Sequence, residues 1–436
     1  MPKLRLVEAL GDACQTRVIQ ALAALLMINA ALLWINPLRD LDPQRLPLEK
    51  TWAWWAVHDF IGEVKAPDVV LLGSSLLMNP VWQNEADFSN ANLDIVVNRR
   101  TRYLESALNQ RLSPKAMASR TIRAAATASA TASAATASPL CFNFALPGAF
   151  VSDDYMILRT MLTGAHRPKV VVLGLSPRDF IENGLRGAAF SPHFRYLKRF
   201  TPIDDIVDVS MPHIWQRAGY FADNHLFFLG KKLEVQCLTQ QFCQNIVDAI
   251  HKPVPVKHSE TAVLAQDVGK AIYETELKEG VWIAQPHLTP PYYEGTGVDE
   301  YKRRYKDSKR IDNQLRWLEM ALKLCRQNDI KVIIVNMPVT ERNLTVYPAG
   351  VYDSCVAAIA NEAKQFNCEF IDLQSTHAFP MSDFSDMWHM NAFGGKRLLD
   401  NVADKIAGNT SLASVLYSGE KASAAPNRSI AGLPRH

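Results

Sequence analysis

Five short apolar runs recur along the chain, and each is nearly free of polar residues. They are Asp68–Gly73, Leu140–Ala145, Lys169–Gly174, Lys331–Asn336 and Cys368–Leu373. Continuous runs of this length are typical of strands that are covered on both faces. Segments with apolar residues at helical spacing lie between them, including 312–325 and 351–366. This alternation predicts an α/β fold with a doubly wound parallel sheet.

Two segments interrupt the alternation. Residues 112–139 are rich in Ala, Thr and Ser, and a tract without large side chains predicts a low-complexity surface insertion. Residues 180–310 separate the third and fourth predicted strands and are too long for a simple crossover. We expect this second insertion to fold over the carboxyl edge of the sheet as a lid or substrate wall, with a packing subdomain as the alternative.

The N-terminal region contains one long apolar stretch, Val18–Ile35, which only Gln20 and Asn29 interrupt. As a helix it would extend about 27 Å, close to the hydrocarbon thickness of a bilayer. No small-x-small cleavage site follows it. The pattern predicts an uncleaved single-pass anchor over 18–36, with a buried N-terminal helix as the alternative.

The anchor divides the rest of the chain into further segments. Residues 1–17 form a tail, 37–66 a juxtamembrane segment, 67–408 the α/β domain, and 409–436 a flexible C-terminal tail. Basic residues flank the anchor almost equally, so the short first segment and the long second one give the orientation. They favour an extracytoplasmic C-terminal domain.

Composition excludes several classes of protein. Apolar residues make up 48% of the chain and charged residues 21%, which is typical of a globular protein. A net charge of +3 gives no reason to expect nucleic acid as a partner. The seven cysteines show neither a zinc spacing nor a disulfide framework, although Cys237 and Cys243 are close enough in sequence to pair.

The candidate chemistry lies at two distant places. Gly73-Ser74-Ser75 follows the first apolar run, and Asp386-x-x-His389 lies near the C-terminus. An imidazole can accept the proton of a serine hydroxyl, and a carboxylate can hold that imidazole in the required tautomer. The residue types predict a serine nucleophile, a general base and an orienting acid.

Other interpretations of these residues remain open. A serine after a strand often caps the next helix, and an Asp-x-x-His segment can be an ordinary surface turn. His377, Asp383, Asp386 and His389 fall within thirteen residues and could ligate a metal, but they lack a fixed ligand spacing. We expect neither a metal nor a cofactor.

Further candidates follow the other predicted strands. The Gly148 amide could donate to an oxyanion because no side chain blocks its approach. Ser176 and Arg178 follow the third strand, and Asn336 ends the fourth. Gly148 could equally be a plain loop glycine, and Asn336 a turn former.

Taken in chain order, Gly73-Ser74-Ser75, Gly148, Gly174–Asp179 and Asp386-x-x-His389 resemble the four blocks of the SGNH (GDSL-like) hydrolase superfamily. The resemblance implies a flavodoxin-like three-layer fold, with Ser75 as nucleophile and Asp386 and His389 as its partners. It also implies an oxyanion hole formed by Ser75, Gly148 and the residue at position 176. That residue is Ser here, whereas the family has Asn, which puts ordinary esterase activity in doubt. Arg178 and Asn336 are candidates for substrate binding.

The phrases LLGSSLL, FNFALPGA, GLSPRDF and DMWHMNAFG look like those of a bacterial membrane-anchored family with this core. A membrane anchor joined to such a core is also similar to polysaccharide O-acetylation proteins and to D-alanyl transfer proteins of teichoic-acid assembly. These resemblances imply a serine esterase or O-acyltransferase acting on acylated carbohydrate or lipid of the cell envelope. A membrane protein that donates the acyl group is a candidate partner. A catalytically inactive scaffold is the alternative.

Overall fold

The computed structural model describes most of the chain, with gaps. The described residues are 17–38, 52, 53, 56, 57, 60, 66–94, 96, 98–113, 138–162, 167–181, 188–198, 201–232, 234, 235, 238, 239, 242, 243, 246, 283–287, 292, 298–305, 310–376 and 378–417. Residues 114–137 of the low-complexity insertion, Cys237 and His377 lie outside these ranges.

The central element is a five-stranded parallel sheet with the order β3-β1-β4-β6-β7. Its strands are β1 (Val69–Gly73), β3 (Cys141–Asn143), β4 (Val170–Leu175), β6 (Lys331–Asn336) and β7 (Glu369–Asp372). β3, the second of these strands in chain order, lies at the edge of the sheet beside β1. The chain then crosses to β4, on the other side of β1. This 2-1-3-4-5 arrangement is a doubly wound order whose ligand crevice lies at the carboxyl ends of the strands.

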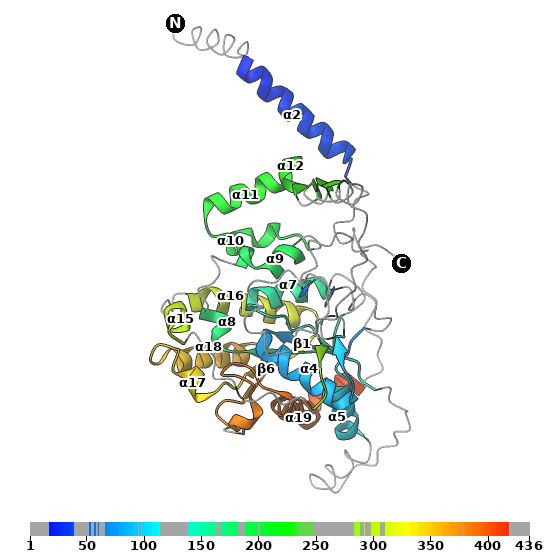
Figure 1. The fold of residues 1–436 in the computed structure, drawn as a ribbon, viewed down its shortest axis with the longest axis vertical. Coiled ribbons are helices and arrows are strands. Elements are labelled where there is room, and N and C mark those ends of the chain that lie inside the picture. The colour runs from blue at the N-terminus through cyan, green and yellow to red at the C-terminus, as the bar shows by residue number, and fades with distance from the viewer. Residues whose placement is uncertain are drawn as a thin grey trace. The chain divides into compact units, whose positions relative to one another are not determined.

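Helices cover both faces of the sheet. One layer contains α4 (Ser75–Ser89), α5 (Arg102–Leu112) and α19 (Ala392–Gly408), which pack against one another. The other contains α7 (Val151–Leu162), α16 (Arg310–Gln327) and α18 (Val351–Gln365). Figure 1 shows α7 and α16 on one side of the strands and α5 and α19 on the other. The sheet between them is buried, in keeping with the continuous apolar runs of its sequence.

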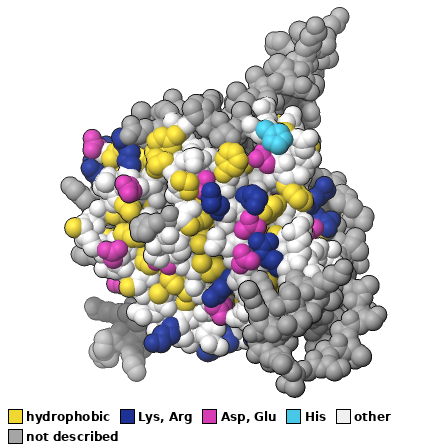
Figure 2. All heavy atoms as spheres, turned by 90° about the horizontal axis from the view of Figure 1, so that it is seen from below, with side chains coloured by type: hydrophobic (Ala, Val, Ile, Leu, Met, Phe, Trp, Pro, Cys, Tyr) yellow, Lys and Arg dark blue, Asp and Glu magenta, His cyan; other side chains and the backbone are white. Residues whose placement is uncertain are grey.

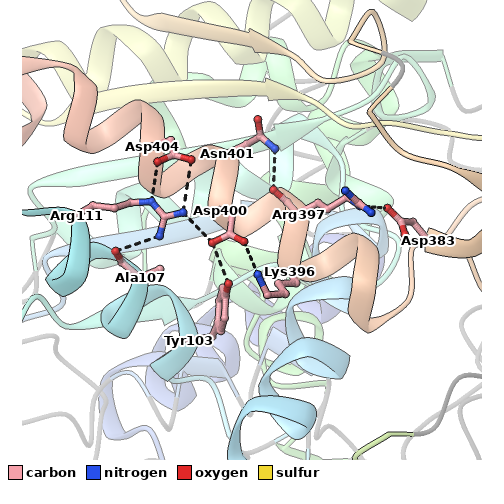
Figure 3. A network of polar contacts seen from close by, with 9 residues as sticks. All are labelled: Tyr103, Ala107, Arg111, Asp383, Lys396, Arg397, Asp400, Asn401 and Asp404. Carbon is pink, nitrogen blue, oxygen red and sulfur yellow. Dashed lines mark hydrogen bonds and ion pairs between the residues drawn. The ribbon is translucent and has the colours of Figure 1, made fainter.

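A polar network fastens α5 to α19, as Figure 3 shows. Arg111 on α5 binds Asp404 at 2.7 Å and Asp400 at 2.9 Å, both on α19. Asp400 also accepts hydrogen bonds from Tyr103 and Lys396. Close packing adds to this layer, because a side chain at Gly395 of α19 would collide with the Pro80 carbonyl of α4.

All five strands predicted from the apolar runs are present, with ends that differ by no more than two residues. The predicted helices over 312–325 and 351–366 are also confirmed, as parts of α16 and α18. A two-stranded antiparallel ribbon, β2 (Leu93–Asp94) with β5 (Ile283–Ala284), was not predicted. The expected C-terminal tail begins instead with the helix α20 (Thr410–Tyr417), which the Asn409 side chain caps.

Shorter helices lie between these elements. They are α8 (Arg178–Ile181), α9 (Pro192–Leu197), α15 (Val298–Arg304), α17 (Glu341–Leu344) and the 3₁₀ turns Ala188–Phe190, Asp204–Ile206 and Met381–Asp383.

The chain divides into two compact units. Unit 1 comprises 1–49 and 205–260, and unit 2 comprises 50–204 and 261–436. Unit 2 contains the sheet and its helical layers. Unit 1 contains α2 (Arg17–Ile35), α10 (Val207–Ser210), α11 (Ile214–His225) and α12 (Phe227–Gly230). The insertion over 180–310 is therefore shared between the two units.

The segment predicted as an anchor forms the helix α2. Within the described ranges, no helix reaches the length and apolarity that crossing a bilayer requires.

Candidate active site

Ser75 owes its position to the end of β1. Gly73 has a φ of 151°, and any side chain there would collide with the carbonyl oxygen of its strand neighbour Gly174. Only glycine therefore lets β1 turn at this point while it stays paired with β4. Ser74 is the N-cap residue of α4, and Ser75 is the first residue of that helix. The nucleophile candidate thus lies at the carboxyl edge of the sheet and at the positive end of a helix.

Ser75 forms one hydrogen-bonded row with His389 and Asp386, which lie more than three hundred positions later in the chain. His389 Nε2 lies 3.0 Å from Ser75 Oγ, and His389 Nδ1 lies 2.8 Å from Asp386 Oδ2. A proton on Nδ1 that is donated to Asp386 leaves Nε2 free to accept the serine proton. The arrangement is that of a nucleophile, a base and an orienting carboxylate.

Backbone amides of the turn that follows Asp386 hold its side chain in this row. Its Oδ1 accepts hydrogen bonds from the amides of Trp388 at 2.6 Å and His389 at 2.7 Å. Burial of Asp386 favours its neutral form, but the adjacent His389 and these hydrogen bonds outweigh burial and hold the pKa of the carboxyl below its ordinary value. Asp386 is therefore an anion at neutral pH, as an orienting group should be.

The loop that carries His389 is fixed at several points. The His389 carbonyl accepts hydrogen bonds from the amide and hydroxyl of Ser385. Thr340, which follows β6, donates its hydroxyl to the Met387 carbonyl at 3.0 Å. Asn391 caps α19 by accepting from the amides of Phe393 and Gly394. The cap could have been read from an Asn before a helical pattern, whereas the role of Thr340 has no local signal.

The segment after β3 runs beside the end of β1 and carries Gly148. The amides of Phe144 and Leu146 donate to the carbonyls of Leu71 and Gly73 at 2.8 and 2.9 Å. The turn at Gly148 is held from α9, because His193 Nε2 lies 2.9 Å from the Pro147 carbonyl oxygen. These contacts bring the Gly148 turn to the strand that ends in the serine.

Arg99 is a second support of this segment, and sequence reasoning missed it. The side chain is fully buried, donates to the carbonyls of Val96 and Ala145, and lies over the rings of Trp82 and Trp52. An arginine is seldom buried, so nothing in the sequence distinguishes this one from a surface residue.

The candidates on the other strands are placed differently. Ser176 follows β4, is fully buried, and donates its amide to Asp179 at 2.9 Å. The amides of Ser75 and Gly148 are therefore the stronger oxyanion candidates. Arg178 begins α8 and is buried at the same strand end. Asn336 ends β6, beyond β4, and donates its amide group to Asp372 and to the Tyr352 hydroxyl. It is not brought to Ser75.

Aromatic side chains pack against Trp388, the neighbour of His389 in the chain. Trp388 is half-buried, and its ring centre lies 4.5 Å from that of Tyr301 on α15. Tyr305 contacts Trp388 edge-on and stacks on Tyr347 at 5.0 Å. Part of the 180–310 insertion thus contacts the loop that carries His389. Ser75 itself is only 1% exposed.

The metal interpretation finds no support among the described residues, where no group of three or more His, Cys, Asp or Glu side chains could hold an ion. The suggested pairing of Cys237 with Cys243 stays a prediction, because Cys237 lies outside the described residues; Cys243 itself is exposed.

Comparison of the chain with protein-family models and with curated proteins finds no match. The functional argument therefore depends on the geometry of the site.

Proposed function

We propose that this protein is a membrane-associated serine esterase or O-acyltransferase of the SGNH type. Its substrates are acyl groups on carbohydrate or lipid of the cell envelope. The observation that carries the proposal is the row Asp386–His389–Ser75, whose two hydrogen bonds measure 2.8 and 3.0 Å. The order of the strands adds support, because Ser75 lies where a sheet of this order holds its ligands.

The reaction follows from the roles of these groups. Ser75 Oγ attacks the acyl carbonyl carbon and passes its proton to His389 Nε2. The amides of Ser75 and Gly148 donate to the oxyanion that forms. Collapse of this intermediate expels the alcohol, which takes the proton from His389, and leaves an acyl group on Ser75. His389 then deprotonates water or an acceptor hydroxyl, which attacks the acyl group, releases the acid or new ester, and restores the serine.

The test measures hydrolysis of p-nitrophenyl acetate by the full chain in detergent. Ser75→Ala and His389→Ala should each lower kcat by at least about 10³-fold, since they remove the nucleophile and the base. Ser74→Ala is the matched control, because this neighbouring buried serine makes no capping hydrogen bond with its side chain. It should retain activity. Hydrolysis that survives Ser75→Ala would refute the proposed mechanism.

A non-catalytic scaffold is the second candidate. Two observations favour it: Ser176 occupies the position where the SGNH pattern has Asn, and Ser75 is almost entirely buried. A fluorophosphonate probe separates the two functions. Labelling of Ser75 in the folded protein supports the enzyme, and an unlabelled Ser75 supports the scaffold.

A further inference from the structure

Unit 1 exposes large apolar side chains on neighbouring helices. On α11, Trp215 is 83% exposed, and on α12, Phe228 is 63% exposed. Scattered apolar residues are normal on a soluble protein, but a contiguous group of them marks a binding surface. The other exposed apolar residues of these two helices are Ile214, Phe221 and Leu229.

The apolar residues of α11 share one side of the helix. At 100° per residue, Ile214, Trp215, Ala218 and Phe221 fall within an arc of roughly 120°. Arg217 lies outside this arc, where it binds Asp208 at 2.6 Å and donates to the Met211 and Pro212 carbonyls. The helix α11 is therefore amphipathic, and Arg217 on its polar side is held by contacts within the protein.

The helix α2 continues this apolar surface. Its Asn29 donates to the His225 carbonyl at 2.8 Å and accepts from the Phe227 amide at 2.7 Å. These are the backbone groups at the break between α11 and α12, beside α2 in Figure 1. Backbone polar groups in lipid must be satisfied within the protein, and one polar side chain of α2 does so here. The exposed apolar residues of α2 include Leu22, Leu25, Leu26, Met27, Ile28, Leu33, Trp34 and Ile35.

The positions of lysine and tryptophan residues indicate that this surface contacts lipid. Two lysines follow α12. Lys232 is exposed and could reach anionic headgroups, whereas Lys231 is paired with Glu234 at 2.9 Å. Trp34 in the last turn of α2 is 88% exposed, and Trp215 in the first turn of α11 is 83% exposed. Indole rings favour the headgroup region of a bilayer. By contrast, the face of the molecule in Figure 2 carries Lys and Arg close to Asp and Glu, as a solvent-exposed face does.

We infer that α11 and α12 insert into one leaflet of a bilayer beside α2, so that several helices rather than one hold the protein at the membrane. Leu238, Phe242 and Ile246 are also exposed, at a spacing of four residues, and extend the same apolar character. The inference rests on the membrane association in the proposed function, but not on its chemistry. A catalytic unit held in this way would act on acylated lipid or on glycans close to the bilayer.

The test uses the full chain in liposomes of phosphatidylcholine and phosphatidylglycerol. The photoreactive residue p-benzoylphenylalanine replaces Trp215 in one variant and Phe228 in another. A third variant carries it at Phe393 of α19, which is 53% exposed but belongs to unit 2. After illumination, mass spectrometry measures lipid adducts. We expect the yields at positions 215 and 228 to exceed that at 393 by at least tenfold.

Two results would overturn the inference. One is a lipid yield at 215 and 228 no higher than at 393. The other is a dominant cross-link to a second protein chain, which would make the surface a protein interface. Esterase activity of the same samples is measured separately. Lipid adducts without activity would refute the proposed chemistry alone, and activity without adducts would refute the membrane surface alone.

Discussion

Asp386 receives more hydrogen bonds than a base-orienting group strictly needs, from the His389 ring and from the amides of Trp388 and His389. These contacts fix the imidazole relative to Ser75 before any substrate binds. At the residue scale, the geometry of the site is therefore set before substrate binds. The Asp386 carboxylate is charged, and the Ser75 hydroxyl already lies within hydrogen-bond distance of His389.

Asp386→Asn tests this orienting role. The amide could present its NH₂ group to the ring and favour the wrong tautomer, so we expect kcat to fall by about 10⁴-fold with KM little changed. Steady-state kinetics with p-nitrophenyl acetate measure both constants. A fall confined to KM would show that Asp386 binds substrate instead.

The pH dependence follows from the lowered pKa of Asp386. A carboxyl whose pKa is lowered on folding stabilises the fold above its unfolded pKa, and loses this contribution as pH falls through the folded value. Asp386 therefore keeps its charge, and its contribution to stability, at mildly acidic pH, so incubation there should not unfold the protein. Activity should return on restoring neutral pH. Irreversible loss over that range would contradict this assignment.

Sequence reasoning named the three residues that form the hydrogen-bonded row, but not the residues that hold them in place. Ser75, Asp386 and His389 could be named because residue type and position after a strand are local signals. Arg99 and His193 act on carbonyls 46 residues away in the chain, and such contacts leave no pattern in their neighbourhood. Asn336 was placed at the right sheet edge, but the sequence could not show that its amide group binds Asp372.

At the element scale, the junction between α4 and α5 contains a buried acid. Glu85 on α4 accepts the amides of Arg102 and Tyr103 at the start of α5, both at 3.0 Å. Burial raises the pKa of Glu85 to about 7, although these hydrogen bonds partly oppose the shift. The folded protein therefore holds this proton more tightly than the unfolded chain does.

Glu85 should make stability fall as pH rises. Between pH 4.5 and about 7, the folded state keeps a proton that the unfolded state has lost, so this group contributes a decrease of about 3 kcal/mol across the range. Glu85→Gln is neutral at every pH and should flatten the curve of unfolding free energy. Urea unfolding at several pH values measures it. The exposed Asp353→Asn is the control, and an unchanged slope in Glu85→Gln would contradict the prediction.

The helix α15 should limit access to the serine. Tyr301 packs on Trp388, which is adjacent to His389, and Ser75 is almost fully buried. Tyr301→Ala should therefore speed fluorophosphonate labelling of Ser75 by several-fold without changing the unfolding free energy by more than about 1 kcal/mol. Time courses of labelling test this. Equal rates in the two proteins would show that α15 does not gate the site.

The strands were predictable because short, continuous apolar runs between helical patterns are typical of a parallel sheet covered on both faces. The ribbon of β2 with β5 was not, since strands of two residues carry no periodicity. The helix α20 was missed because its sequence, TSLASVLY, is short and lies next to a tail without apolar periodicity.

At the scale of the whole molecule, the division into two units changes the view of the 180–310 insertion. The sequence predicted one lid or wall. In the structure, α15 contacts the loop that carries His389, while residues 205–260 group with the N-terminal segment. Within this group, Asn29 forms hydrogen bonds with residues nearly two hundred positions away, and such pairing cannot be read from one sequence.

The most direct test of the central claim is to trap the acyl group on the enzyme. The intact protein is mixed with p-nitrophenyl acetate, quenched in acid within the first turnovers, digested, and examined by mass spectrometry. The account predicts an acetyl group on Ser75, and no acetylation of that peptide in Ser75→Ala or His389→Ala. Turnover of the ester with Ser75 left unmodified, or with the acetyl group on another residue, would contradict it.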